Sequence, residues 1–194
     1  MRKVIKYADS NIIKEKLNYI QGNSANNRKI RDILFEEQKK FCAYTDECFS
    51  RTDKGDIEHF DPTLKNTAKD NYYNWFLVKH QWNKEKSNRW KTYQPVLHPT
   101  AQDFEERIIY DGGDYIAQAS DEEAKNVIKL LQLDDPDLAD ERKQYIERKK
   151  KEIKDTEQDP FSFFSILIKK DRCRVSYLRA IKEEFGVDIW EILS

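Results

Sequence analysis

The segment spanning residues 56–90 constrains the fold of this chain most, because its pattern changes repeatedly within a short length. An apolar-aromatic run at residues 57–60 suits a short strand, and residues 65–71 are polar with no apolar period, as in an exposed loop. A second apolar run follows at residues 75–78, and residues 81–91 are rich in Lys, Asn and Arg, which suits a basic helix. The expected order is therefore strand, loop, strand and helix.

Polar residues at three points of this segment resemble a known sequence motif. Glu58 and His59 end the first run, Asn74 precedes the second, and Asn83 stands three residues before Lys86. This order resembles the HNH nuclease motif of the ββα-metal fold. The Ile-Glu-His-Phe form is similar to the HNH proteins of Septu-like and retron-linked anti-phage defence systems.

The likeness extends over most of residues 30–150. It implies an α+β, mainly helical chain in which a ββα-metal (HNH) finger is embedded between N-terminal and C-terminal helices. We expect helical support in residues 1–40, the finger in residues 41–95, and a hairpin with further helices of the same domain in residues 96–194. The Gly112-Gly113 pair is typical of the hairpin turn.

The resemblance implies metal-dependent hydrolysis of phosphodiester bonds in DNA. His59, whose ordinary pKa is near neutrality, would be the general base, and Asn74 would hold the loop or the imidazole in position. Asn83 completes the catalytic set and, with Glu58, would supply oxygen ligands to one Mg²⁺ or Mn²⁺. Because neighbours in a regular strand point to opposite faces, Glu58 and His59 share a site only if the strand ends there.

Each residue also has a plainer interpretation. A lone His beside Phe60 is usually a packed or surface histidine. Asn74 can cap a turn, and Asn83 can be an ordinary exposed helix residue. The alternative function is therefore a catalytically degenerate HNH-fold subunit that binds nucleic acid or acts as an adaptor.

Many HNH relatives carry two Cys-x-x-Cys pairs that form a structural zinc knuckle. Here Cys42 is followed at that spacing by Thr45, and the second pair falls on Lys79 and Trp82. Cys42 and Cys48 alone cannot complete a tetrahedral zinc site. We expect no structural zinc, and packing of aromatic side chains in its place. The aromatic residues expected there are Phe41, Tyr44, Trp75 and Trp82.

Charge is unevenly distributed, although the net charge of the 194-residue chain is only −1. Residues 62–95 carry seven Lys or Arg against two acidic residues, whereas residues 101–147 carry fourteen acidic residues against five basic ones. Positive charge thus gathers where a phosphate backbone would lie, although a solvated Lys-rich face is the plainer reading of so short a run. The candidate DNA contacts are Lys79, Lys84, Lys86, Arg89 and Lys91.

Three cysteines, at positions 42, 48 and 173, form no even disulfide framework, and no signal peptide is evident. Both observations favour the reducing cytoplasm. The longest apolar run, at residues 161–168, is too short to cross a bilayer, so we expect no membrane association. The resemblance further implies a partner ATPase protein, with this chain as the effector nuclease of a defence complex.

Overall fold

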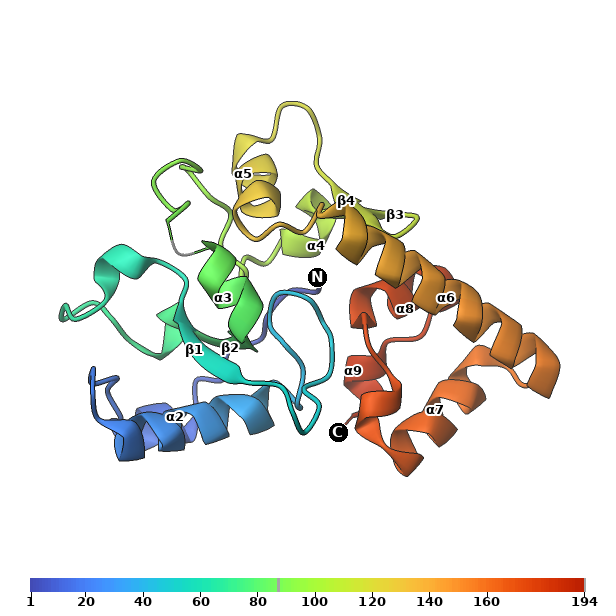
Figure 1. Ribbon diagram of the computed structural model, residues 1–194, viewed down its shortest axis with the longest axis horizontal. Helices are drawn as coiled ribbons and strands as arrows, with labels where there is room; N and C mark the ends of the chain where they lie inside the picture. The colour runs from blue at the N-terminus through green and yellow to red at the C-terminus, as the bar shows by residue number, and fades with distance from the viewer. Residues whose placement is uncertain (87, 194) are drawn as a thin grey trace.

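The computed structural model describes residues 1–86 and 88–193, and within them it shows an α+β architecture dominated by helices (Figure 1). One antiparallel sheet pairs β1 (Gly55–His59) with β2 (Trp75–Lys79). A second pairs β3 (Ile109–Asp111) with β4 (Asp114–Ile116). The expectation of a mainly helical α+β chain is confirmed.

The first sheet has the strand, loop, strand and helix order expected from the sequence. Its register joins Gly55 to Lys79 and His59 to Trp75, and helix α3 (His80–Lys86) follows β2 without a break. The loop between the strands contains two short 3-10 helices, η1 (Pro62–Leu64) and η2 (Tyr72–Asn74). The helix ends at Lys86, earlier than the basic run in the sequence.

Helix α2 (Ser24–Glu37) packs against this sheet, and in Figure 1 it runs below β1 and β2. The Asn23 side chain caps α2 by accepting a hydrogen bond from the backbone of Asn26. Ile30 and Leu34, four residues apart, are fully buried on one face of α2. The short helix α1 (Asn11–Lys14) precedes it and is capped by Ser10.

The segment from Phe41 to Cys48, called the knuckle-like turn because the resemblance places a cysteine pair there, folds back on itself. Phe41 and Cys48 form a β-bridge, and the free Cys42 thiol is buried where it accepts a hydrogen bond from the Lys79 backbone at 3.4 Å. Burial raises the pKa of the Cys42 thiol. The aromatic residues expected to pack here are buried at Phe41, Tyr44 and Trp75 and half-buried at Trp82.

The C-terminal half is built from the second sheet and a set of helices. The helices before residue 136 share the hydrophobic cluster of the first sheet, whereas those from residue 136 onward pack around a second cluster. Asp135 caps the long helix, which starts at Pro136, a position where proline loses no helical hydrogen bond. No helix of the described residues is both long and apolar enough to cross a bilayer. The helices are α4 (Phe104–Arg107), α5 (Glu122–Leu130), α6 (Pro136–Thr156), α7 (Pro160–Lys170), η3 (Arg172–Arg174), α8 (Leu178–Phe185) and α9 (Ile189–Ile192).

The expected hairpin turn lies at Gly112-Gly113, where both glycines have a positive φ. A side chain at Gly113 would place its Cβ 2.6 Å from the backbone oxygen of Ala139. The turn therefore packs directly on helix α6, which extends from it across the C-terminal helices (Figure 1).

A disulfide bond between Cys48 and Cys173 links the knuckle-like turn to η3, with the two Cα atoms 5.1 Å apart. This bond corrects the expectation that the cysteines form no framework. The pairing was not visible in the sequence because the partners are 125 residues apart and only the fold brings them together. The cysteine count therefore no longer supports a reducing compartment.

We expect the Cys173→Ser variant to be less stable than the unmodified chain by about 2–4 kcal/mol, because the bond closes a long loop and restricts the unfolded chain. Urea denaturation without reductant measures this difference. Adding reductant should lower the stability of the unmodified chain to that of the variant and leave the variant unchanged. Equal denaturation midpoints for the two oxidised proteins would contradict the bond.

Candidate functional site

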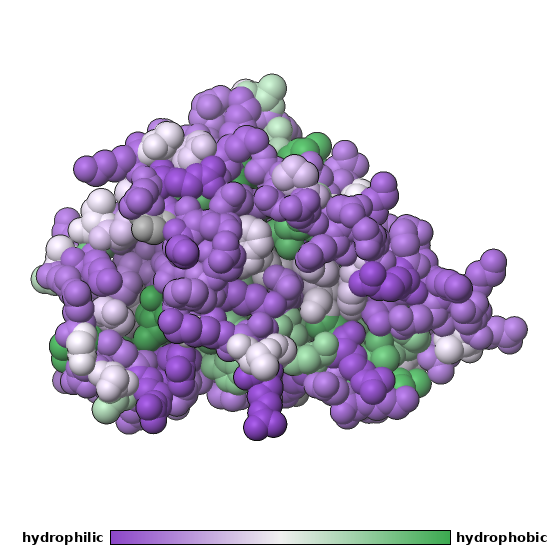
Figure 2. Space-filling view, in the orientation of Figure 1, coloured by the Kyte–Doolittle hydropathy of each residue, from purple (hydrophilic) through white to green (hydrophobic). Residues whose placement is uncertain are grey.

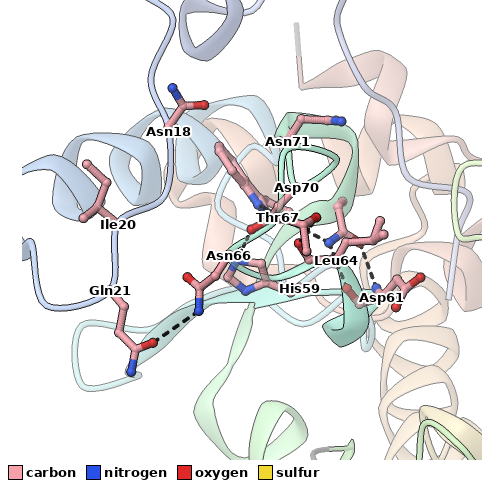
Figure 3. A network of polar contacts seen from close by, with 12 residues as sticks. Asn18, Ile20, Gln21, His59, Asp61, Leu64, Asn66, Thr67, Asp70 and Asn71 are labelled. Atoms are coloured by element: carbon pink, nitrogen blue, oxygen red, sulfur yellow. Dashed lines mark hydrogen bonds and ion pairs between the residues drawn. The ribbon is translucent and has the colours of Figure 1, made fainter.

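His59 ends β1 and lies beside the loop that joins the two strands (Figure 3). Its side chain is 6% exposed, and Nε2 lies 3.1 Å from Oδ2 of Asp70. At this distance the two groups would form an ion pair only with a protonated imidazole, and in the structure Nε2 has no aligned hydrogen-bond partner. The ring packs edge-on against Tyr19, with centroids 4.6 Å apart, and against Trp75 at 6.3 Å.

Asn74 closes the loop that carries Asp70. Its Oδ1 accepts a hydrogen bond from the backbone of Asp61 at 2.8 Å, and its Nδ2 donates to the Asp61 carbonyl at 3.0 Å. The same Nδ2 donates to Oδ1 of Asp70 at 3.1 Å, and Trp75 Nε1 donates to that oxygen at 2.7 Å. The structure thus brings His59 and Asn74 together through Asp70.

Asp70 was not among the site residues expected from the sequence. Its carboxylate spans the site, because one oxygen receives two side-chain hydrogen bonds and the other faces His59. One sequence signal pointed to it. Within the seven-cation segment of residues 62–95, Asp70 and Glu85 are the only acids, and Asp70 stands four residues before Asn74.

Burial lowers the pKa of the His59 imidazole below its ordinary value, and the positive charge of Lys65 acts in the same direction. The Asp70 carboxylate opposes this shift. Burial is the larger effect, so the ring is neutral near pH 7. A neutral imidazole is the form that can accept a proton.

Glu58 and Lys86 form a buried ion pair on the α3 side of the sheet, which corrects two expectations. The Lys86 Nζ donates to the Glu58 carboxylate and to the backbone carbonyls of His59, at 2.9 Å, and Phe60, at 2.6 Å. Lys86 is 4% exposed, so it is not a surface contact for DNA. Glu58 does not share a site with His59, because β1 stays regular through both residues and alternate side chains point to opposite faces.

Asn83 lies near the start of β1, away from His59. Its Nδ2 donates to Oδ2 of Asp56 at 3.0 Å, and His80 Nδ1 lies 2.6 Å from the same oxygen. Asn83 therefore does not converge with His59 and Asn74, which corrects the expected constellation. The rotation of α3 about its own axis places the Asn83 side chain beside Asp56.

The donors implied for one Mg²⁺ or Mn²⁺ do not fit a shared cation site. The Glu58 carboxylate faces the Lys86 ammonium, and the Asn83 amide donates to Asp56. Three oxygen atoms, of the kind that hard cations bind, instead surround Lys86 Nζ. Within the described residues, no group of three or more His, Cys, Asp or Glu side chains is arranged to hold a metal.

The other four residues expected to contact DNA differ in their exposure to solvent. Lys84 and Lys91 are exposed. Arg89 is half-buried and donates to the Tyr93 hydroxyl at 3.2 Å. Lys79 lies near the knuckle-like turn, where the carboxylates of Glu47 at 3.0 Å and Asp53 at 3.4 Å raise its pKa although burial opposes the shift.

His98, in the connector after α3, packs against Phe60 with ring centroids 4.8 Å apart. Its Nδ1 lies 2.8 Å from the Thr100 hydroxyl and accepts from the Thr100 backbone at 3.3 Å, which requires an unprotonated nitrogen. Burial lowers the pKa of His98 to about 4, and Lys6 adds to this shift. His98 is therefore uncharged, and its contacts are those of a side chain that packs within the fold.

We expect His98 to make folding less stable in acid. Because the pKa of the folded form is about 4 and the ordinary value is 6.5, only the unfolded chain gains a proton between these values. Stability therefore falls as the pH decreases through this window, and His59 contributes with the same sign. In urea denaturation across this window, the free energy of unfolding of His98→Gln should decrease less with falling pH than that of the unmodified chain. An unchanged slope would contradict the assignment.

Protein-family models, curated proteins and solved structures gave no match to this chain. A functional assignment therefore depends on its own residues and their geometry. The strongest element of that geometry is the connected set His59, Asp70 and Asn74, which lies where the loop joins the two strands and is followed by helix α3 with the exposed Lys84.

Proposed function

We propose that this chain is an HNH-type endonuclease that hydrolyses phosphodiester bonds in DNA, with His59 as the general base. The observation that carries the proposal is the neutral imidazole at the end of β1, held beside the carboxylate of Asp70. A histidine supported by a carboxylate is a common arrangement for proton transfer near neutral pH. The resemblance of the surrounding motif to HNH nucleases supports the choice of substrate.

In this mechanism His59 takes a proton from the water that attacks the phosphorus atom, the bond from phosphorus to the leaving sugar oxygen breaks, and that oxygen takes a proton from solvent. Asp70 then stabilises the imidazolium, and Asn74 fixes the loop that carries Asp70. The exposed Lys84 and Lys91 would contact the phosphate backbone. The implied Mg²⁺ or Mn²⁺ receives no step, because Glu58 and Asn83 do not face a common point.

The cellular role follows from the same resemblance. HNH proteins of Septu-like and retron-linked defence systems support the proposal that this chain is an effector nuclease. Its partner would be an ATPase protein, and its location would be the cytoplasm. The closed position of His59, beneath Tyr19 and the loop, fits an enzyme that is opened by assembly.

Incubation of supercoiled plasmid with the protein and Mg²⁺ or Mn²⁺ tests the activity, with His59→Ala as the control. The assay is repeated with the partner ATPase protein present. We expect nicked or linear plasmid with the unmodified chain only. Equal cleavage by the variant, or no cleavage under any of these conditions, would overturn the proposal.

The buried pair of Glu58 and Lys86 favours a second candidate function. If the Lys86 ammonium permanently takes the place of a metal ion, the chain binds nucleic acid as a subunit that does not cut. A mobility-shift assay with the assembled complex separates the two functions. DNA binding without cleavage in Mg²⁺ and in Mn²⁺ would establish the second.

A further inference from the structure

A cavity of about 370 Å³ opens beside the loop that carries Asp70. It shares Asp61 and Asn74 with the proposed site, and its other walls come from the loop and from the connector after α3. The side chains that matter for its chemistry are Phe60, Lys69, Tyr73, Trp90, Gln94 and His98. A volume of this size lies at the lower end of the range for small-ligand pockets, about 300–1,000 Å³.

Aromatic rings dominate the cavity. The Tyr73 side chain is 49% exposed, stands at the end of the loop and meets Tyr72 edge-on, with ring centroids 5.4 Å apart. Trp90 is half-buried and meets Phe60 edge-on at 5.4 Å. His98 also contacts Phe60 and is uncharged, so the inner wall offers flat rings, and the buried Lys86 ammonium lies behind Phe60 and Trp90 at 5.5 and 5.3 Å from their ring centres.

The rim carries polar groups of the kind that bind a nucleotide. Gln94 is exposed and brings an amide donor and acceptor, with one N–H donating to the Trp90 carbonyl at 3.0 Å. Lys69 is exposed at the same rim and next in sequence to Asp70, where its cation can contact a phosphate. Flat apolar walls with a polar rim and a cation match a nucleobase attached to its backbone.

We propose that this cavity binds an unpaired nucleobase of the substrate, so that the enzyme prefers a single strand, or a strand with an extruded base, over intact duplex. A base within a duplex cannot present its ring faces to Tyr73 or Trp90, whereas an unpaired base can stack on aromatic side chains. The bound base would lie next to the loop closed by Asn74 and would hold the chain beside His59. This inference rests on the proposed function and specifies its substrate.

Binding is tested separately from cleavage, in the His59→Ala background. Fluorescence anisotropy compares a labelled single-stranded DNA of about 12 nucleotides, a length within the range bound by single-strand proteins, with its blunt duplex and with the matching RNA. Variants are Tyr73→Ala, Tyr73→Phe and, as an exposed aromatic control on helix α7, Phe161→Ala. Unlabelled nucleoside monophosphate serves as a competitor.

We expect the single strand to bind more tightly than the duplex, and Tyr73→Ala to weaken single-strand binding about five-fold or more, the loss of one base stack. Tyr73→Phe and Phe161→Ala should bind normally, and duplex affinity should not change. Equal binding of single strand and duplex, equal losses in Tyr73→Ala and Phe161→Ala, or displacement by monophosphate at the same concentration as the oligonucleotide would overturn the inference.

The two proposals fail in different ways. Binding that depends on Tyr73 without plasmid cleavage would overturn the nuclease proposal and support the proposal that the cavity binds a base. Cleavage that depends on His59, with no single-strand preference and no effect of Tyr73→Ala, would support the nuclease proposal and overturn the proposal that the cavity binds a base. DNA and RNA single strands in parallel identify the sugar that the site accepts.

Discussion

Substitution of His59 by Ala is expected to reduce DNA cleavage by about 10²- to 10⁴-fold, the usual contribution of a general base. The imidazole lies 3.1 Å from Asp70 and is kept neutral by burial, so the substitution removes the proton acceptor of the proposed reaction. Initial rates of plasmid nicking measure the loss. His80→Gln, which alters an exposed histidine outside this set, is the matched control and should retain activity.

Asp70→Asn gives a second measure of the same site. It removes the charge that raises the pKa of His59, so the ring should become a weaker base and the rate should fall. Since the pKa of His59 is already below its ordinary value, the acid limb of the rate profile should lie below pH 6.5 and move lower in Asp70→Asn. A profile that is the same for both proteins would contradict the pairing.

Substitution of Lys86 by Met is expected to destabilise the fold by about 3–5 kcal/mol, because it leaves the Glu58 carboxylate buried without its partner. Both side chains are almost fully buried, so water does not replace the lost contact. The backbone carbonyls of His59 and Phe60 also lose their donor. Urea denaturation followed by circular dichroism measures the change.

Two further variants show whether the pair itself is the cause. Lys84→Met changes an exposed lysine on the same helix and should alter stability by no more than about 0.5 kcal/mol. The double variant Glu58→Gln with Lys86→Met should recover much of the loss, because no charge is left buried. A double variant no more stable than Lys86→Met alone would show that the unpaired Glu58 charge is not the cause of the loss.

Local patterns in the sequence predicted the parts of the fold that depend on neighbours in the chain. The two apolar runs became β1 and β2, the basic run began as α3, and the paired glycines formed the turn between β3 and β4. Each of these depends on periodicity or backbone freedom over a few residues. The bond between Cys48 and Cys173 had no such signal, because it depends on tertiary approach.

The candidate site shows the same division. His59 and Asn74 were expected and are connected, but Asp70, which connects them, was not expected because its role depends on the path of an aperiodic loop. Glu58 was separated from His59 by the alternation of side chains along a strand. The direction of Asn83 depends on how α3 is rotated over the sheet, which no spacing in the sequence fixes.

The covering of His59 has a consequence for the timing of the proposed reaction. Tyr19 lies against the imidazole, and the Lys65 ammonium of the loop lies 5.3 Å from the centre of the Tyr19 ring. Asn66 of the loop also donates a hydrogen bond, 3.5 Å long, to Gln21 (Figure 3). Most of the face drawn in Figure 2 is hydrophilic, whereas Leu17 and Tyr19 of this segment pack against the hydrophobic core. If the proposed reaction takes place, Tyr19 and its segment must shift before a phosphate group can reach the imidazole.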